Sequence, residues 1–256
     1  MKDLVRQIIV ILTVIATITI NILANALPLN GLNTGEISDQ FLVLFVPAGY
    51  VFSIWGLIYI GLIAYAIFQA LPSQRENPRL RSTGYLVALS GLANIAWIFL
   101  WHYEQFPWTL IAMFTLLASL IAIYLRLGTG ITKVSTAENW AVRIPFSVYL
   151  GWITVATAAN ITDVLYFLNW NGFGISAEVW FLVVLAAVIV ISGLISLTRR
   201  DIAYNLVILW ALVGIAVKHS SITLVMVSSL VAAVIVAAIL VYSRIKPKAA
   251  LATPQV

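Results

Sequence analysis

The sequence contains no cysteine and few charged residues. Without cysteine, the chain has no disulfide, thiolate nucleophile, covalent c-type haem or cysteine-based zinc or iron–sulfur site. Charged residues make up 9% of the 256 residues, against about 25% in soluble domains. Hydrophobic residues make up 62%, and the mean hydropathy is +1.06. This composition predicts a polytopic membrane protein.

The small number of charged residues and histidines argues against several other functions. The net charge of +5 comes from basic residues scattered at the ends of apolar segments, so we expect no nucleic-acid partner. The two histidines, His102 and His219, also stand at segment ends, with too few acidic residues nearby to complete a metal centre. A hydrolytic site needs a base close to its nucleophile, and His102 is the only candidate at its end of the segments. We therefore expect no metal, no catalytic residue and no enzymatic activity.

Eight apolar runs indicate an all-α, polytopic integral membrane protein with about eight transmembrane helices. Each run reaches 16 residues or more, which approaches or exceeds the length that crosses a bilayer, and 202–217 is the shortest. The runs lie at about 4–27, 47–71, 84–103, 107–126, 144–168, 178–198, 202–217 and 221–243.

Basic residues sort cleanly when the N-terminus is placed in the cytoplasm. All Lys and Arg except Lys218, that is 13 of 14, then fall on the cytoplasmic side. This pattern predicts a multi-pass protein of the cell (inner or plasma) membrane with both termini cytoplasmic. The first run also resembles a signal peptide that ends at Ala24-Asn25-Ala26, but its length and the i, i+4 pair Asn21 and Asn25 favour a retained, packed helix.

The connecting segments carry further expectations. We expect the apolar second half of the 28–46 loop to fold as a lid or as a partial helix on the membrane. Pro72 and Pro78 stop helix propagation in 72–83. Ser135 is expected to cap the approach to the fifth helix, with Glu138 three residues on. The tail from Lys246 is expected to be disordered.

Three of the predicted helices carry a stripe of polar and aromatic residues at helical spacing, and all three stripes lie at a similar depth near the 28–46 loop. This depth favours a shared cavity for a flat apolar ligand. Three alternatives remain open: an interfacial aromatic belt, interhelical hydrogen bonds by the asparagines, and an acid that snorkels to water. The stripes comprise Phe52, Trp55 and Tyr59; Asn94, Trp97 and Trp101; and Tyr149, Trp152, Asn160 and Asp163.

The same three segments resemble those of a known family. The stretch 148–169 reads VYLGWITVATAANITDVLYFLN and is similar to the fifth helix of the tryptophan-rich sensory protein family (TspO/MBR, the translocator proteins), roughly PYLxWxxFAxxLNxxxxxLN. The stretch 47–59, PAGYVFSIWGLIY, resembles that family's WxFxPVWTxLY, and 92–101, LANIAWIFLW, resembles LNxxWxxxFF. In this chain Tyr50 stands where the family has the first Trp, and the three helices at about 178–243 have no counterpart in five-helix members.

The resemblance covers about residues 4–170 and implies a five-helix bundle that binds tetrapyrroles, sterols or synthetic aromatic ligands. It implies that Trp55, Asn94, Trp97, Trp152 and Asn160 line the cavity. We therefore divide the chain into a TspO-like ligand-binding bundle (1–170), a three-helix membrane extension (171–245) and a cytoplasmic tail (246–256).

The function expected from these observations is that of a membrane receptor or carrier with a sensory or regulatory role. Its ligand would be a hydrophobic, planar, tetrapyrrole-like molecule, such as a porphyrin or a haem-like compound bound without a covalent link. The alternative is a secondary transporter of a small hydrophobic solute that uses the same cavity. The expected partners are this ligand and the lipid bilayer, and a homodimer remains open.

Overall fold

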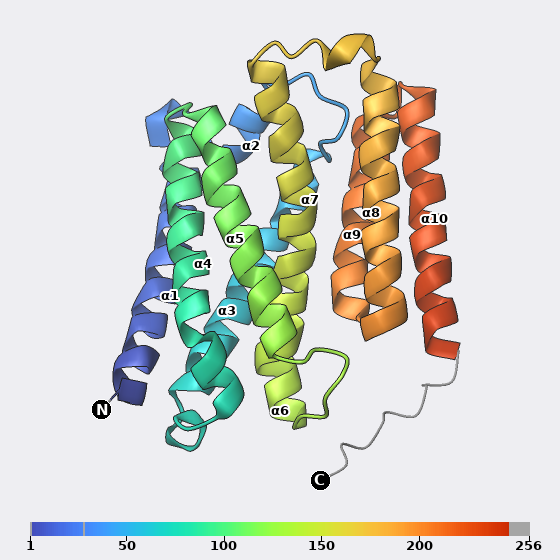
Figure 1. Cartoon of the computed structure of the whole chain (residues 1–256). Helices are drawn as coiled ribbons and strands as arrows, with labels where there is room; N and C mark the ends of the chain where they lie inside the picture. Colours follow the sequence, from blue (N-terminus) through green and yellow to red (C-terminus); the bar gives the residue numbers. More distant parts are fainter. Residues whose placement is uncertain (1, 28, 246–256) are drawn as a thin grey trace.

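The computed structural model describes residues 2–27 and 29–245, and over these ranges the chain forms helices and no strand (Figure 1). In this part of the chain seven helical stretches are long and apolar enough to cross a membrane, and α9, with 17 residues, is shorter. The fold class and the number of apolar helices are therefore as predicted. The eight main helices are α1 (Lys2–Ala26), α3 (Ile54–Ala70), α4 (Pro78–His102), α5 (Phe106–Arg126), α7 (Ile144–Phe167), α8 (Ala177–Arg199), α9 (Ile202–Lys218) and α10 (Thr223–Ile245).

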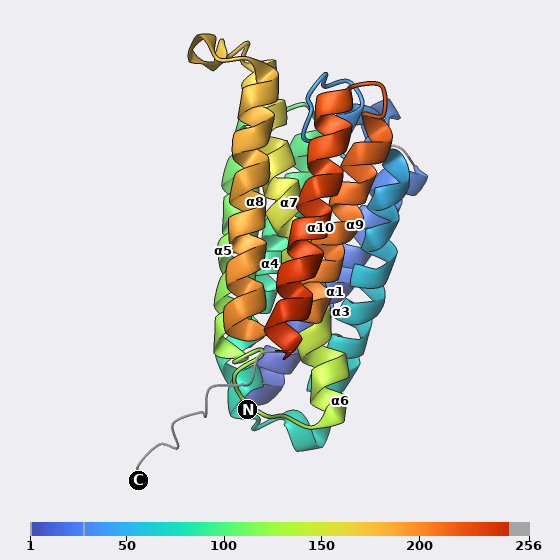
Figure 2. The ribbon, with the colours of Figure 1, turned by 90° about the vertical axis from the view of Figure 1, so that its right-hand side faces the viewer.

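Five of these helices form a ring in the order α1, α4, α5, α7, α3. Within the ring, α3 makes the fewest contacts with its neighbours α1 and α7. The remaining three helices gather beside α7, where α9 packs against α7 and α10 packs against both α9 and α8 (Figures 1 and 2).

Successive long helices run in opposite directions, so the bundle has two chemically different ends. We call the end at which α1 begins the arginine end. The opposite end, which carries the 29–46 segment, is called the loop end. At the arginine end, Arg79 binds Glu138 at 2.5 and 2.8 Å, and Arg81 binds Asp3 at 2.9 and 2.7 Å. The topology predicted from the basic residues requires helices that alternate in direction, as these do. Which end of the bundle faces the cytoplasm stays a prediction.

Two helix starts follow local capping rules. Ser135 accepts a hydrogen bond from the Glu138 amide at 3.1 Å, as predicted. Asn77 caps α4 and Pro78 occupies its first turn, so α4 begins six residues before the predicted 84, and Pro78 starts a helix as well as ending the preceding turn. A π-helical segment, Asn139–Arg143, leads into α7 and was not predicted.

The 29–46 segment lies over the loop end. Its short helix α2 (Thr34–Ser38) falls in the first half, because Asn33 and Glu36 form a reciprocal capping box there. The second half forms no regular helix, so the expected partial helix at that position is wrong. That half nevertheless buries Phe41 and Phe45 against the bundle. We call residues 29–46 the lid.

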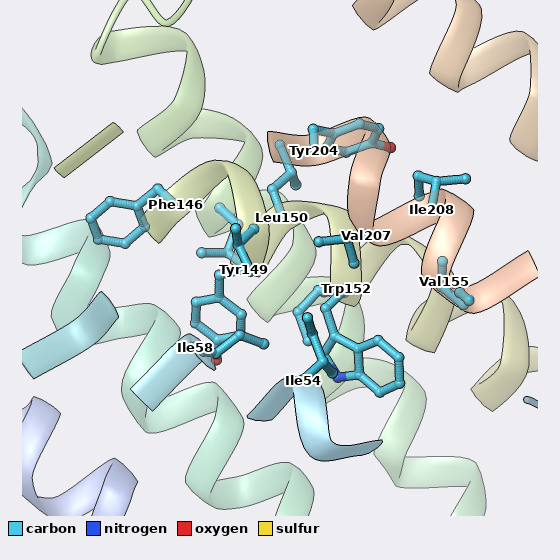
Figure 3. Close-up of a cluster of buried hydrophobic side chains, with 14 of the residues drawn as sticks. Ile54, Ile58, Phe146, Tyr149, Leu150, Trp152, Val155, Tyr204, Val207 and Ile208 are labelled. Carbon is cyan, nitrogen blue, oxygen red and sulfur yellow. The ribbon is translucent and has the colours of Figure 1, made fainter. Parts of the chain in front are cut away.

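One buried carboxylate, Asp201, links the start of α9 to the ring. Asp201 caps α9 by accepting from the Tyr204 amide at 3.1 Å. Its other oxygen accepts from Tyr124 of α5 at 2.9 Å and from Ser147 of α7 at 2.6 Å. Figure 3 shows that apolar side chains of α7 lie between those of α3 and those of α9. The predicted disordered tail, 246–256, lies outside the described residues, and the division at residue 170 stays a prediction.

Candidate functional site

A partly open cavity lies within the ring of five helices, beneath the lid. Its wall contains eight of the ten predicted site residues, contributed by α3, α4 and α7 and by the turn that leads into α3. These eight are Phe52, Trp55, Asn94, Trp97, Trp101, Trp152, Asn160 and Asp163. Of the other two, Tyr149 lies behind Asn94, and Tyr59 lines a neighbouring cleft.

Two chains of hydrogen bonds connect helices at this cavity. Asn21 of α1 donates to Asn94 at 2.6 Å, and Asn94 donates to the Tyr149 hydroxyl at 3.1 Å. These bonds link α1, α4 and α7. The predicted interhelical role of Asn94 is therefore present in the structure.

The second chain lies nearer the loop end. Trp97 donates its indole N–H to Asn160 at 3.1 Å, and Asn160 donates to the Thr109 hydroxyl at 2.9 Å. This chain joins α4 to α7 and α5. Because both asparagines use their amide groups within the bundle, they hold the wall in one arrangement.

The aromatic rings of the stripes pack on one another. Trp97 stacks on Trp101 with ring centres 5.2 Å apart, and Trp55 stacks on Tyr59 at 5.7 Å. Trp152 meets Trp55 edge-on at 6.3 Å. Such offset and edge contacts contribute about 0.5–1.5 kcal/mol each beyond the buried area. The rings of α3 and α7 therefore pack on one another, and Trp97 and Trp101 of α4 form a second stack. We call these rings together the aromatic surface.

Two polar groups in the cavity wall lack a partner among the described residues. These are the Trp152 indole Nε1 and the Asp163 Oδ1. Both side chains are only 3% exposed. A buried donor or carboxylate without a partner costs free energy, so each is a natural contact point for water or for a polar group of a ligand.

The cavity within the ring is small. Its volume, measured for the centre of a water-sized sphere, is about 50 Å³. That space holds a few water molecules, whereas pockets for drug-sized ligands measure about 300–1,000 Å³. A ring system as large as a tetrapyrrole does not fit inside the cavity in this arrangement of the helices.

A larger, open cleft adjoins the cavity, between α1, α3, α4 and the lid. Its volume by the same measure is about 660 Å³. The cleft and the cavity share four wall residues, Thr34, Phe52, Trp55 and Trp97, so the two spaces meet at these side chains. The cleft has the size of a ligand pocket and presents one face of the aromatic surface.

Several wall residues were not predicted as site residues. Asn21 and Asn25 of α1 line the cleft, and Thr34 of the lid contacts both spaces. Asn25 accepts from the Thr34 amide at 3.2 Å, and Thr34 contacts His102 at 3.1 Å. The sequence signal for these two asparagines was their i, i+4 spacing, because it indicated that they share a packed helix face.

In the described ranges no group of three metal-ligating side chains comes together.

The fold and the site together define a multi-pass helical membrane protein with an aromatic-lined binding space. The chain belongs to the TSPO-like protein family, which matches residues 7–242. This membership indicates a membrane-bound ligand-binding or sensory protein of a generally non-enzymatic family. The match extends through α8 and α9 and into α10, beyond the range of about 4–170 in which the motifs were recognised. No curated protein and no solved structure matches the chain.

Proposed function

We propose that the protein is a membrane receptor or carrier that binds a planar hydrophobic molecule of tetrapyrrole size and has a sensory or regulatory role without catalysis. The observation that carries this proposal is the cleft of about 660 Å³ with Phe52, Trp55, Tyr59 and Trp97 in its wall. The volume lies in the range of ligand pockets.

The four rings are suited to a flat partner. All four are partly exposed, so their faces are available to a ligand. The stacked pair Trp55 and Tyr59 and the stacked pair Trp97 and Trp101 keep these rings in place, which reduces the entropy lost on binding. The polar groups of the lid and of α1 then contact the edge of the ligand.

The proposal predicts saturable quenching of tryptophan fluorescence by a neutral porphyrin. The variants Trp55→Leu and Trp97→Leu are each expected to weaken binding about three- to tenfold, because each removes one aromatic contact, worth about 0.5–1.5 kcal/mol. The measurement is a fluorescence titration of the full chain in nonionic detergent.

The matched control is Trp140→Leu. Trp140 lies at the arginine end and is 67% exposed, so its loss leaves the cleft intact. Equal affinity in all four proteins, or quenching that does not saturate, would place the porphyrin in the detergent or at another surface and would contradict the proposal.

One observation favours the alternative of a secondary transporter. Asp163 is a buried carboxylate with an unpartnered oxygen beside the cavity, and acids at such positions act as proton relays in transporters. Under this alternative, flux of a hydrophobic solute into proteoliposomes depends on pH, and Asp163→Asn abolishes it. Binding without any flux would support the receptor.

A further inference from the structure

The charged residues around the site indicate which class of ligand it favours. The acidic residues at the loop end are Glu36, Asp39, Glu104, Asp163 and Glu178. Among the described residues at this end, Lys218 is the only Lys or Arg. Lys218 is paired with Asp39 at 2.7 Å. The two histidines also lie at this end. His102 uses both ring nitrogens, in contacts with Thr34 and with the Leu29 carbonyl, and His219 directly follows α9.

Neither binding space contains a basic side chain. Glu36 and Asp39 line the cleft, Asp163 lines the cavity, and no Lys, Arg or His belongs to either wall. Glu36 and Asp39 are exposed, so water and salt weaken their effect, which is mainly to attract cations towards the cleft. Asp163 is 3% exposed, and its interactions are screened much less.

The aromatic surface adds to this preference. The faces of Trp, Tyr and Phe rings carry partial negative charge and attract cations within about 6 Å, by roughly 0.5–2 kcal/mol each. Phe52, Trp55, Tyr59 and Trp97 present such rings to the cleft. An anionic ligand, including a tetrapyrrole with two carboxylates, would meet these faces and Asp163 without a basic partner.

The volumes of the cleft and of the cavity indicate which part of a ligand each space can hold. A flat ring system fits the cleft of about 660 Å³, while the cavity of about 50 Å³ has room only for a small head group or a few waters. Because Phe52, Trp55 and Trp97 border both spaces, a molecule that lies on these rings has the cavity directly beside it.

Asp163 is the acidic group of the cavity wall, and the charge of Lys218, which is paired with Asp39 outside that wall, acts on it. The Asp163 Oδ1 has no hydrogen-bond partner among the described residues, and an ammonium group supplies both a donor and the opposite charge. The other unpartnered group, the Trp152 indole N–H, lies three helical turns from Asp163 on α7, roughly 16 Å along the axis. It is therefore too far away to bind the same group of the ligand.

We infer that the ligand is an aromatic amine, with a flat ring system in the cleft against Trp55 and Trp97 and a protonated amine in the cavity at Asp163. This inference rests on the proposed function, because it names the chemical class that the same site accepts.

The test uses three probes with one ring system and different charge: 1-pyrenemethylamine, 1-pyrenemethanol and 1-pyrenecarboxylate. Each is titrated at pH 7 against the full chain in nonionic detergent, with energy transfer from tryptophan to pyrene as the readout. We expect the amine to bind at least tenfold more tightly than the alcohol and the carboxylate to bind more weakly than both. In Asp163→Asn the affinity ratio of the amine to the alcohol is expected to fall below threefold.

The outcomes separate the two proposals. If the alcohol binds saturably but the three probes bind equally, or the carboxylate binds most tightly, the amine inference is overturned and the planar-ligand function stands. If none of the probes and no porphyrin binds saturably, the proposed function itself fails. The comparison of probes on the unmodified chain decides the charge preference even if Asp163→Asn does not fold.

Discussion

Gly130→Ala is expected to lower the free energy of unfolding by about 2–4 kcal/mol. Gly130 has a φ of +77°, in the left-handed region that costs an L-residue roughly 1–2 kcal/mol. An added Cβ would also overlap the Arg199 carbonyl oxygen, and such overpacking typically costs about 1–3 kcal/mol. The measurement is thermal or denaturant unfolding of the full chain in detergent.

Gly174→Ala is the matched control. Gly174 has nearly the same φ, +76°, but nothing lies within 4 Å of its added Cβ. Gly174→Ala is expected to lower the free energy of unfolding only by the cost of a left-handed backbone, roughly 1–2 kcal/mol. Equal losses in the two variants would mean that the loop after α5 does not pack closely on the end of α8.

This contact matters because it joins distant parts of the chain. The loop that follows α5 meets the last turn of α8, where Arg199 also donates to the Thr129 carbonyl at 3.5 Å. About 70 residues separate the two segments. Gly130 is thus one of the positions at which α8 is fixed to the ring of five helices.

Local features of the fold could be predicted from the sequence, because they depend on neighbours along the chain. The apolar runs predicted the helices, and Ser135 predicted a cap. The lid also contained a usable signal, since Asn33 followed three residues later by Glu36 is typical of a helix start. The apolar run after it was expected to form a lid or a partial helix on the membrane, and it packs onto the bundle without a regular helix, with Phe41 and Phe45 buried.

The candidate site could be predicted only in part. Helical spacing placed Asn94, Trp97 and Asn160 on inward faces, because periodicity alone shows which residues share a face. It could not show that Asn94 meets Asn21, since that bond depends on how α1 and α4 pack. The small volume of the cavity depends on side-chain packing among four helices and the lid. No pattern in the sequence indicated the cleft beside the cavity.

The contact between α9 and the turn before α3 has a consequence for binding. Gly214 of α9 accepts from the Ala48 amide at 3.1 Å, and Trp210 donates to the Val51 carbonyl at 3.2 Å. These bonds hold the segment that carries Phe52 and leads into α3. Since α3 makes few contacts within the ring, the bonds from α9 add support to the turn at which this wall of the cleft begins.

Gly214→Ala is therefore expected to weaken binding of the probe as well as the fold. The added Cβ would overlap Val51 and contact Pro47, so the turn must move, at a cost of about 1–3 kcal/mol in the free energy of unfolding. Phe52 and Trp55 move with the turn. We expect the affinity for 1-pyrenemethanol to fall about tenfold, measured in the same titration.

Gly56→Ala in α3 separates the two effects. Nothing lies within 4 Å of its added Cβ, and replacing a helical glycine by alanine stabilises a helix by about 1 kcal/mol. This variant should bind the probe normally and unfold at the same or a higher temperature. If Gly214→Ala is destabilised yet keeps full affinity, α9 supports the fold without setting the geometry of the cleft. If affinity falls, at least one of the helices beyond residue 170 belongs to the binding site.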